Sequence, residues 1–333
     1  MMIRVAINGF GRIGRLAFRE MISSDKLDVV AINDLSAPSM LAYLLKYDSV
    51  QGTFKKNISY NDNELIIDNK HVVVYAERDP HNLPWAKHQI DLVLECTGIF
   101  ESKDKASAHL SAGAKKVIIS APSDKDVKTI VYNVNNQILT SEDRLISCAS
   151  CTTNCLAPMA KVLNDKFGIL AGQMTTIHAY TNSQPLMDTP DPKVNYRKSR
   201  AAADSIVPYT TGAAKAIGLV IPELNGKLDG SSQRVPVHSG SVVELFSLLG
   251  KEVSVAEINA AMQGATNESY GYTEDPIVSS DVIGISYGSL FDATQTKVIT
   301  AGNNQLVKTA SWYDNEMSFV SQMVRVAAYF GAL

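Results

Sequence analysis

The sequence has few cysteines, no long apolar run and almost no net charge. Four cysteines among 333 residues are too few for a disulfide framework. No apolar run approaches the ~20 residues of a membrane-spanning helix, and the opening residues MMIRVAINGFGRIGR lack the apolar core of a signal peptide. The formal charge of −3 gives no net attraction to nucleic acid or to an anionic membrane. We therefore expect a cytoplasmic protein that requires neither partner.

Short apolar strands alternate with helices in the first half of the chain. The runs 3–7, 28–32, 91–95 and 116–119 each end in small polar residues, and a helical pattern over 13–21 follows the first of them. This alternation predicts a parallel sheet with helices on both faces, which binds ligands at the carboxyl ends of its strands. At ~150 residues per domain, the length predicts two domains.

A glycine motif, Gly9-x-Gly11-x-x-Gly14, lies between the first strand and its helix. In a dinucleotide-binding turn, Gly9 would allow the tight turn and Gly11 would let the backbone approach the pyrophosphate. Gly14 would let the helix pack closely against the strand. Asp34 ends the second strand, where a carboxylate can bind ribose hydroxyls and would repel a 2′-phosphate. The motif therefore favours NAD over NADP, although Asp34 can also be read as a turn residue only.

Three cysteines, Cys148, Cys151 and Cys155, lie close together before a helical pattern that ends at Gly168. Cys151 is expected at the helix start, where backbone N–H groups would lower the pKa of its thiol and could stabilise an oxyanion. Cys155, one turn later, is read as a buried packing residue. Pro158 is expected within the first turns of that helix, where a missing N–H costs little.

Two other uses of the cysteine cluster are open. Zinc would need a second pair of ligands, which the sequence does not offer, so no metal site is expected. A redox pair of Cys148 with Cys151 lacks the usual flanking sequence. Cys148 is read either as an inert buried thiol or as a thiol that captures an oxidised Cys151.

A histidine and several cations follow. His178, in the β-rich run 173–181, is either a core residue or a base paired with Cys151. Basic residues cluster at 196–200 within a long loop, Thr211-Gly212 precedes a further helical pattern, and Arg234 enters an apolar strand, where its burial requires an anion. These cations predict a phosphorylated substrate.

The motifs together resemble those of phosphorylating, glycolytic glyceraldehyde-3-phosphate dehydrogenases, in particular the Gram-positive bacterial members. The resemblance runs through the whole chain. The matching segments are INGFGRIGR at 7–15, AIND at 31–34, LLKYDS at 44–49, AERDP at 76–80, ECTG at 95–98, SCTTNCLAP at 150–158, TTIHAYT at 175–181, TTGAAKA at 210–216, PELNGKLDG at 222–230, RVP at 234–236 and SWYDNE at 311–316.

The resemblance implies a role for each matching residue. Cys151 would be the nucleophile and His178 its base, acting on glyceraldehyde 3-phosphate and inorganic phosphate. The implied phosphate-binding residues are Ser150, Thr152, Thr181, Arg197, Thr211, Gly212 and Arg234. The implied contacts to NAD come from Phe10, Gly11, Arg12, Ile13, Asp34, Arg78, Thr97, Ser120, Asn182 and Asn315, the last of which would orient the nicotinamide.

The resemblance also implies an architecture. It is an α/β fold with a Rossmann dinucleotide-binding domain, formed by 1–150 plus a C-terminal helix at 316–333, and a second α+β catalytic domain at 151–315. A homotetramer is implied, in which the 180–204 loop reaches toward a neighbouring subunit.

Several residues depart from the family pattern, among them Lys198 and Phe319. Lys198 replaces a residue of an arginine-rich or glycine-rich loop and cannot grip a phosphate bidentately, and Phe319 stands where tyrosine is usual. Two alternative functions are open: an aldehyde oxidation like that of erythrose-4-phosphate dehydrogenase, and a non-enzymatic role in surface binding. Thr211-Gly212 and the CLAP segment after Asn154 weigh against the first, and a complete catalytic set weighs against the second.

Overall fold

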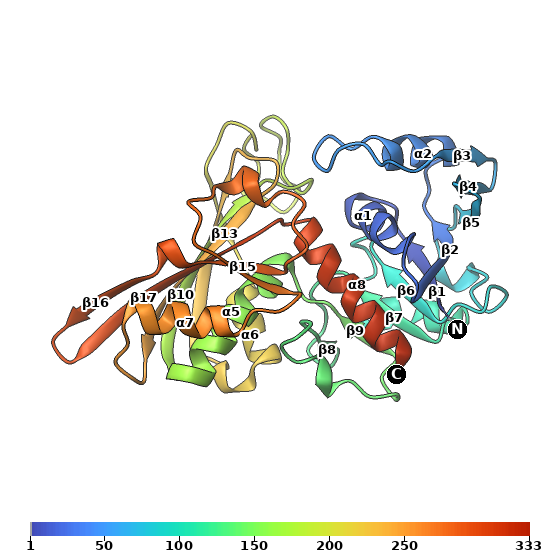
Figure 1. Ribbon diagram of the computed structural model, residues 1–333. Coiled ribbons are helices and arrows are strands. Elements are labelled where there is room, and N and C mark those ends of the chain that lie inside the picture. Colours follow the sequence, from blue (N-terminus) through green and yellow to red (C-terminus); the bar gives the residue numbers. More distant parts are fainter. Residues whose placement is uncertain (1) are drawn as a thin grey trace. The chain divides into compact units, whose positions relative to one another are not determined.

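The computed structural model describes residues 2–333, and the chain divides into two compact units (Figure 1). The first unit comprises Met1–Ser150 and Val320–Leu333, and the second comprises Cys151–Phe319. The chain leaves the second unit after Phe319, a little later than the expected boundary at 315. In the described part of the chain, no helix is both long enough and apolar enough to span a membrane.

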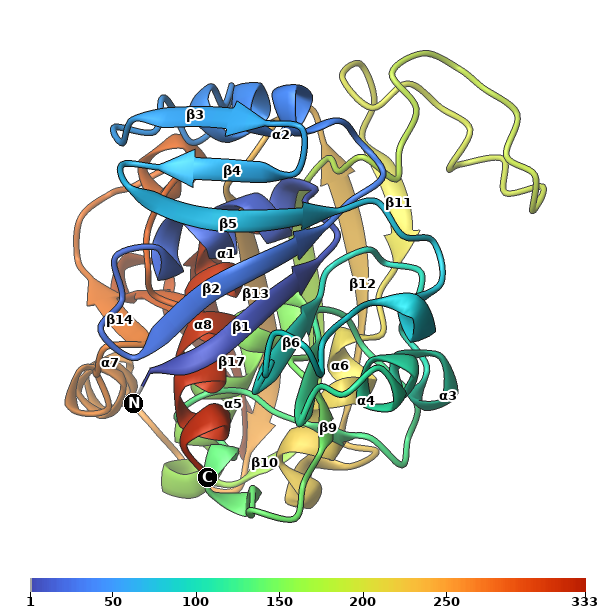
Figure 2. The same ribbon diagram turned by 90° about the vertical axis from the view of Figure 1, so that its right-hand side faces the viewer.

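The first unit is built on a nine-stranded sheet with the order β3-β4-β5-β2-β1-β6-β7-β9-β8. All neighbours are parallel except β3 with β4 and β4 with β5. Figure 2 shows the strands from β3 to β6 in this order. The strands are β1 (Ile3–Asn8), β2 (Leu27–Asn33), β3 (Ile58–Asn61), β4 (Glu64–Ile67), β5 (Lys70–Tyr75), β6 (Leu92–Glu95), β7 (Lys116–Ile119), β8 (Lys128–Thr129) and β9 (Leu145–Ser147).

The order of these strands sets where a ligand can bind. The chain runs outward from β1 through β2 to β5 in one direction and from β6 through β7 to β9 in the other, so its direction reverses between β1 and β6. Ligands of such sheets bind at this reversal, beyond the carboxyl ends of the strands. The helices are α1 (Arg12–Met21), α2 (Pro38–Lys46), α3 (Lys103–Ala106) and α4 (Ala108–Ser111).

The last helix, α8 (Met317–Ala332), contributes its residues from Val320 onward to the first unit. Lys116 on β7 donates to the Phe330 carbonyl at 2.8 Å and lies over the Phe330 ring. Ser321 donates to the carboxyl group of Glu20 at 3.1 Å, and burial raises the pKa of that group. These contacts join the two ends of the sequence within one core.

The second unit is built on an eight-stranded, mostly antiparallel sheet with the order β11-β12-β10-β13-β17-β15-β14, and β16 pairs with β17. Its strands are β10 (Ile169–Ala179), β11 (Val207–Thr210), β12 (Leu228–Val235), β13 (Ser241–Leu249), β14 (Tyr270–Thr273), β15 (Ser289–Asp292), β16 (Lys297–Ala301) and β17 (Asn304–Tyr313). Its helices are α5 (Cys151–Phe167), α6 (Ala213–Val220), α7 (Val255–Gly264) and the start of α8.

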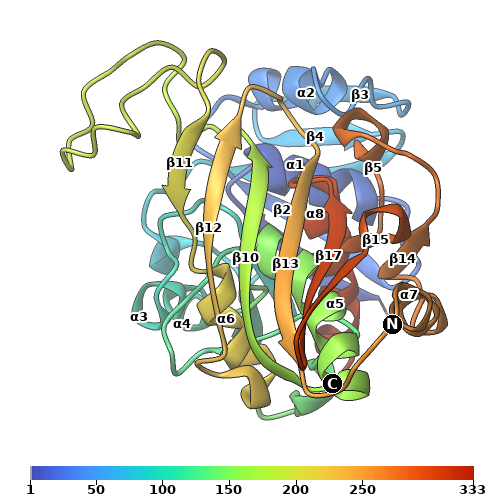
Figure 3. The ribbon, with the colours of Figure 1, turned by 90° about the vertical axis from the view of Figure 1, so that its left-hand side faces the viewer.

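Helices cover one face of the second sheet. Helix α5 contacts β10, β13, β15 and β17, and α6 contacts β12. Along β13 the residues alternate, with Val243 and Leu245 buried and Phe246 and Leu248 exposed by 37% and 41%. The exposed members of this alternation lie on the other face, which no helix of the second unit crosses (Figure 3).

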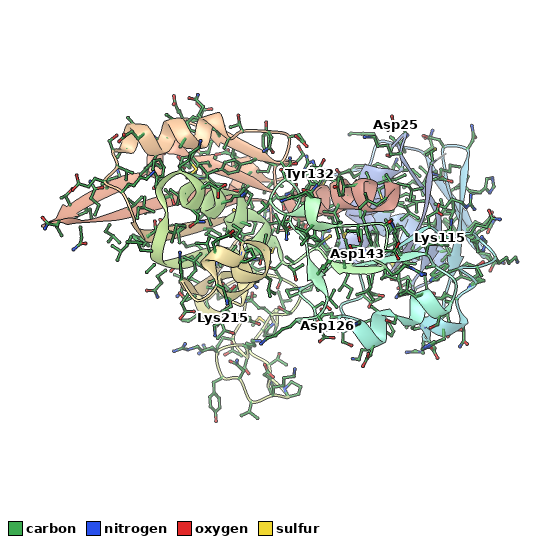
Figure 4. All side chains as sticks on the ribbon, turned by 90° about the horizontal axis from the view of Figure 1, so that it is seen from below. Asp25, Lys115, Asp126, Tyr132, Asp143 and Lys215 are labelled. Atoms are coloured by element: carbon green, nitrogen blue, oxygen red, sulfur yellow. The ribbon has the colours of Figure 1, made fainter. Side chains whose placement is uncertain are left out.

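A long loop joins β10 to β11 without regular structure and projects from the second unit (Figures 2 and 3). Several of its apolar side chains are exposed, including Leu186 by 78% and Tyr196 by 82%. Figure 4 shows its side chains standing away from the rest of that unit.

Candidate active site

The glycine turn of the first unit has the geometry that its sequence predicts. Gly9 has a φ of +90°, which side-chain-bearing residues rarely adopt. A Cβ atom at Gly14 would lie 2.1 Å from the Gly9 carbonyl oxygen, so this position requires glycine. At Gly11 a Cβ atom would meet nothing within 4 Å, which leaves the backbone open to a ligand at the start of α1.

A pocket of about 380 Å³ lies in the first unit beside this turn. Four of the predicted cofactor residues line it: Gly11, Asp34, Arg78 and Thr97. Gly9 of the glycine motif also lines it, together with seven residues that sequence reasoning did not assign to the cofactor: Asn8, Asn33, Leu35, Glu77, Cys96, Ile99 and Phe100. Asn8 and Asn33 end their strands, so the rule that ligands bind at strand ends could have found them.

The Asp34 carboxylate is held by the backbone and also lines this pocket. Its Oδ2 atom accepts from the Phe10 N–H at 2.8 Å, and its Oδ1 atom accepts from the Ser36 N–H at 2.9 Å. Both interpretations of Asp34 are thus compatible, because each oxygen keeps a second lone pair for a ligand.

The other predicted cofactor residues of the first unit do not line the pocket. The Phe10 side chain is buried against Phe18, which leaves its backbone as the part able to meet a ligand. Arg12 donates to Asp48 at 2.5 Å, and this bond counters burial and lowers the pKa of the Asp48 carboxyl group. Ile13 follows in the first turn of α1, and the Ser120 N–H donates to the Glu95 carbonyl at 3.0 Å.

In the second unit, the path of the chain brings Cys151 to His178. Helix α5 begins at Cys151 and extends about 25 Å, and β10 then returns over about 33 Å to its end near His178. The Cys151 Sγ atom lies 3.5 Å from the His178 Nε2 atom. This contact supports the prediction of a cysteine–histidine pair and disfavours a purely structural histidine.

The hydrogen bonds of His178 define where its proton lies. The Nδ1 atom lies 2.6 Å from the Ala179 carbonyl oxygen, which can only accept, and 3.1 Å from Arg234 Nη1, which can only donate, so the shorter contact assigns the proton to Nδ1. Nε2 is therefore the unprotonated nitrogen facing the thiol. Burial and the nearby Arg234 lower the pKa of His178 to about 3, so the imidazole is neutral before a ligand binds.

The N–H groups at the start of α5 lower the pKa of the Cys151 thiol as expected, but they do not decide its direction. Burial of the sulfur raises this pKa, and it outweighs Arg234, the Thr152 hydroxyl and the N–H groups at the helix start, all of which lower it. The thiol therefore stays protonated until His178 takes its proton. The position expected for Pro158 is wrong, because it lies in the interior of α5, where it removes the N–H that would bind the Asn154 carbonyl.

Arg234 forms a cationic site next to this pair. Its Nη1 atom lies 3.1 Å from both the Ala179 oxygen and His178 Nδ1, and donates to the Thr181 hydroxyl at 3.3 Å. Among the described residues no carboxylate pairs with Arg234, and its buried Nε atom has no hydrogen-bond partner. A half-buried guanidinium without a carboxylate partner suits an incoming phosphate.

The remaining predicted phosphate residues lie on several different elements. Thr211 accepts from the Ala213 N–H at 3.2 Å, and Gly212 precedes α6. Arg197 is exposed in the long loop, and Ser150 immediately precedes α5. The Thr152 hydroxyl is buried, 2.9 Å from the Tyr313 hydroxyl.

Two predicted cofactor residues belong to the second unit. Asn182 is exposed at the start of the long loop. The Asn315 amide oxygen faces Ser241, whose hydroxyl accepts from the Ala179 N–H at 3.0 Å and donates to Asn315 Oδ1 at 3.3 Å. Asn315 can therefore offer Nδ2 as a donor, which suits a carbonyl oxygen of the ligand.

Tyr313 is the residue of this site that sequence reasoning missed. Its ring packs edge-on against His178 with centroids 5.8 Å apart, and its hydroxyl contacts Thr152 at 2.9 Å and Thr176 at 2.8 Å. It stands two residues before Asn315, and no local pattern marks it as different from any other buried tyrosine of a strand.

The structure also shows the environment of the other cysteines of the cluster and of Lys198 and Phe319, which differ from the family pattern. Cys155 is buried, as predicted, and lies 3.4 Å from the Ser311 carbonyl oxygen. Cys148 is buried and its thiol pKa is raised, which favours the inert interpretation. Lys198 lies over the Tyr209 ring, and Phe319 is buried. The described residues contain no cluster suited to a metal ion.

Comparison with known proteins gives the family. Residues 3–103 match the family model described as "Glyceraldehyde 3-phosphate dehydrogenase, NAD binding domain", and residues 150–315 match "Glyceraldehyde 3-phosphate dehydrogenase, C-terminal domain". The chain belongs to the glyceraldehyde-3-phosphate dehydrogenase family.

Relatives within the family match the chain from end to end. A glyceraldehyde-3-phosphate dehydrogenase of Clostridium pasteurianum is 63% identical over 332 residues, which are 100% of this chain and 99% of the relative. Those of Clostridium acetobutylicum and Streptococcus pyogenes are 61% and 58% identical with the same coverage. The predicted family, fold class, NAD cofactor and dehydrogenase activity are confirmed.

Alanine at two glycines should separate folding from cofactor binding. Gly14→Ala should lower the free energy of unfolding by about 2 kcal/mol or more, because its Cβ atom would overlap the Gly9 carbonyl. Gly11→Ala should cost less than about 1 kcal/mol in stability but raise the Kd for NAD about tenfold. Urea unfolding and calorimetric NAD titration measure the two quantities, and equal stability losses would contradict the packing role of Gly14.

Removal of His178 should slow alkylation of Cys151. Because the thiol pKa is raised, the thiolate fraction and the rate with iodoacetamide should increase with pH between about 6 and 9. His178→Asn should slow this reaction about tenfold or more at pH 7 and move its rise to higher pH. Mass spectrometry of the Cys151 peptide measures the rate, with Cys155 as the buried reference thiol. An unchanged profile would rule out His178 as the base.

Proposed function

We propose that the chain oxidises D-glyceraldehyde 3-phosphate with NAD and inorganic phosphate, giving 1,3-bisphosphoglycerate in glycolysis. The observation that carries this proposal is the arrangement around His178. One side of the imidazole faces the Cys151 thiol at 3.5 Å, and the other faces the Arg234 guanidinium at 3.1 Å. A nucleophile, its base and a phosphate-binding cation are therefore close enough for one small substrate molecule to contact all three.

The first step uses the cysteine–histidine pair. Cys151 Sγ attacks the aldehyde carbon while His178 Nε2 accepts the thiol proton and passes it to the carbonyl oxygen, which gives a thiohemiacetal. Arg234 and Thr181 bind the phosphate of the substrate, and this contact sets the distance from the phosphate to the reacting carbon.

The second step oxidises this adduct. His178 Nε2 accepts the proton of the thiohemiacetal hydroxyl, and the carbon becomes a thioester on Cys151. When bound, NAD supplies the acceptor for the hydride that leaves this carbon. The low pKa of His178, about 3, keeps its imidazole neutral before a ligand binds.

Inorganic phosphate then attacks the thioester carbon, the bond from this carbon to the Cys151 sulfur breaks, and the sulfur takes back the proton held on His178 Nε2 as the acyl phosphate leaves. We assign the second phosphate position to Ser150, Thr152, Thr211 and Gly212, with Arg197 of the long loop adding positive charge. The N-terminus of α6 after Gly212 supports this assignment, because helix N-termini bind anions.

The two units divide the work. We assign cofactor binding to residues 1–150 with the C-terminal helix and catalysis to residues 151–315. The open backbone at Gly11 and the pocket lined by Asp34 and Thr97 suit the adenosine half of NAD. Asn315, which can offer an amide donor, suits the nicotinamide carboxamide. The four reduced cysteines and a phosphorylated metabolite as substrate support a cytoplasmic location.

Activity should require phosphate, NAD and Cys151. NADH formation from glyceraldehyde 3-phosphate should increase with added phosphate or arsenate, and catalytic efficiency with NADP should be at least tenfold lower because of Asp34. Cys151→Ser should lower kcat by about a thousandfold or more. Oxidation that ignores phosphate would favour the hydrolytic, erythrose-4-phosphate-like alternative. A Cys151→Ser protein with full biological effect would favour surface binding.

We propose that the chain assembles as a homotetramer. The uncovered face of the second sheet exposes Leu170 by 60%, Ile299 by 62% and Leu306 by 40%, in addition to Phe246 and Leu248. The long loop adds exposed Leu186, Met187 and Tyr196. Apolar patches of this extent mark interfaces between proteins, and a second copy of the chain is the partner that the family supports.

Light scattering checks this assembly. The wild-type chain should have the mass of four subunits, and Phe246→Glu should lower the mass at micromolar concentration, because a buried unpaired charge opposes association. Lys251→Glu, at an exposed polar position, serves as the control and should leave the mass unchanged. A monomeric wild-type chain at working concentration would contradict the proposal.

A further inference from the structure

A buried row of polar residues lies under the cofactor pocket of the first unit. Asn33, Asn8 and Glu95 end the neighbouring strands β2, β1 and β6 in matched register. They are exposed by only 5%, 1% and 2%. Burying a carboxyl group is costly unless hydrogen bonds satisfy it, and Glu95 adds negative charge beneath a site that binds an anionic dinucleotide. Neither packing nor ligand charge explains its presence.

Glu95 is satisfied by four donors from three directions. Its Oε2 atom accepts from Asn8 Nδ2 at 2.5 Å and lies 3.0 Å from His109 Nε2. Its Oε1 atom accepts from the Thr97 N–H at 2.7 Å and from the Thr97 hydroxyl at 2.5 Å. The Thr97 hydroxyl in turn accepts from the Ile99 N–H at 3.1 Å. The carboxylate thus holds the 97–99 turn, which is one wall of the pocket.

Trp85 fixes the direction of this hydrogen bonding. Its indole N–H can only donate, and it lies 3.0 Å from His109 Nδ1, which must therefore accept. The proton of a neutral His109 is consequently on Nε2, directed at Glu95. The His109 ring also contacts Phe100, a residue of the pocket lining, with centroids 6.3 Å apart. His109 therefore supports the same wall at two points.

We propose that Trp85, His109 and Glu95 form a direction-locked hydrogen-bond chain that positions the 97–100 wall of the NAD pocket. Glu95 acts through Thr97 and does not itself line the pocket, so it is a positioning residue. The inference rests on NAD binding by the first unit. Wild-type NAD binding tests that function, and the variants below test the hydrogen-bond chain of Trp85, His109 and Glu95.

Glu95→Gln keeps the shape of the side chain but can replace the acceptor that faces His109 and Asn8 with a donor. With its oxygen toward Thr97, the new amide N–H₂ group faces the N–H donors of His109 and Asn8. We expect the Kd for NAD to increase about tenfold, with kcat at saturating NAD within about twofold of wild type. Glu20→Gln is the matched control. It alters another carboxyl group of the first unit, bonded to Ser321, and should lower stability without changing the Kd.

A second substitution tests the direction of the chain. Trp85→Phe removes the indole donor and lets His109 move its proton to Nδ1, so that Nε2 can accept from the amide that E95Q introduces. The double variant E95Q/W85F should therefore bind NAD more tightly than E95Q, despite losing a further hydrogen bond. Purely structural losses would add and give the opposite order.

Calorimetric NAD titration, with urea unfolding of each variant, decides the proposal. An unchanged Kd for E95Q, or weaker binding by the double variant than by E95Q, would overturn it. Should E95Q fail to fold, Thr97 carries the test, because Thr97→Val loses the hydroxyl that bonds Glu95 and Thr97→Ser keeps it. T97V should then bind NAD about fivefold more weakly than T97S, and equal affinities would overturn the proposal.

Discussion

The hydrogen bond from His178 Nδ1 to the Ala179 carbonyl is the constraint on which the chemistry of the second unit depends. It leaves Nε2, which is the ring nitrogen that faces Cys151, without a proton. Arg234 disfavours a second proton on the ring and donates to the same carbonyl at 3.1 Å. A single oxygen atom therefore orients both the base and the cation. An oriented, unprotonated nitrogen therefore stands beside the protonated thiol.

The same principle orients the polar groups of both units. A group that can only donate or only accept fixes the next group, and the direction then passes along the contacts. The Ala179 carbonyl, which can only accept, fixes His178 in this way, just as the Trp85 indole, which can only donate, fixes His109. Sites built in this way are preorganised, since no amide or ring has to turn when a charged ligand arrives.

The sequence was informative wherever function depends on local spacing. The glycine turn, the helix that begins at Cys151 and the strand that contains His178 follow from neighbouring residues, as does the role of Gly14 in packing. Tyr313 and Glu95 did not, because their importance arises from partners far along the chain. The direction of the Cys151 pKa did not follow from the sequence, for the same reason. The helix start is visible in the sequence, but the burial that outweighs it is not.

The uncovered face of the second sheet has a thermodynamic consequence. If its apolar side chains, such as Phe246 and Leu248, meet a second copy, association and folding share one free energy. The melting temperature then becomes a function of protein concentration, and dilution acts as a denaturant. A substitution at this face would alter the amount of folded protein in a cell by mass action, without touching the cysteine, the histidine or the dinucleotide pocket.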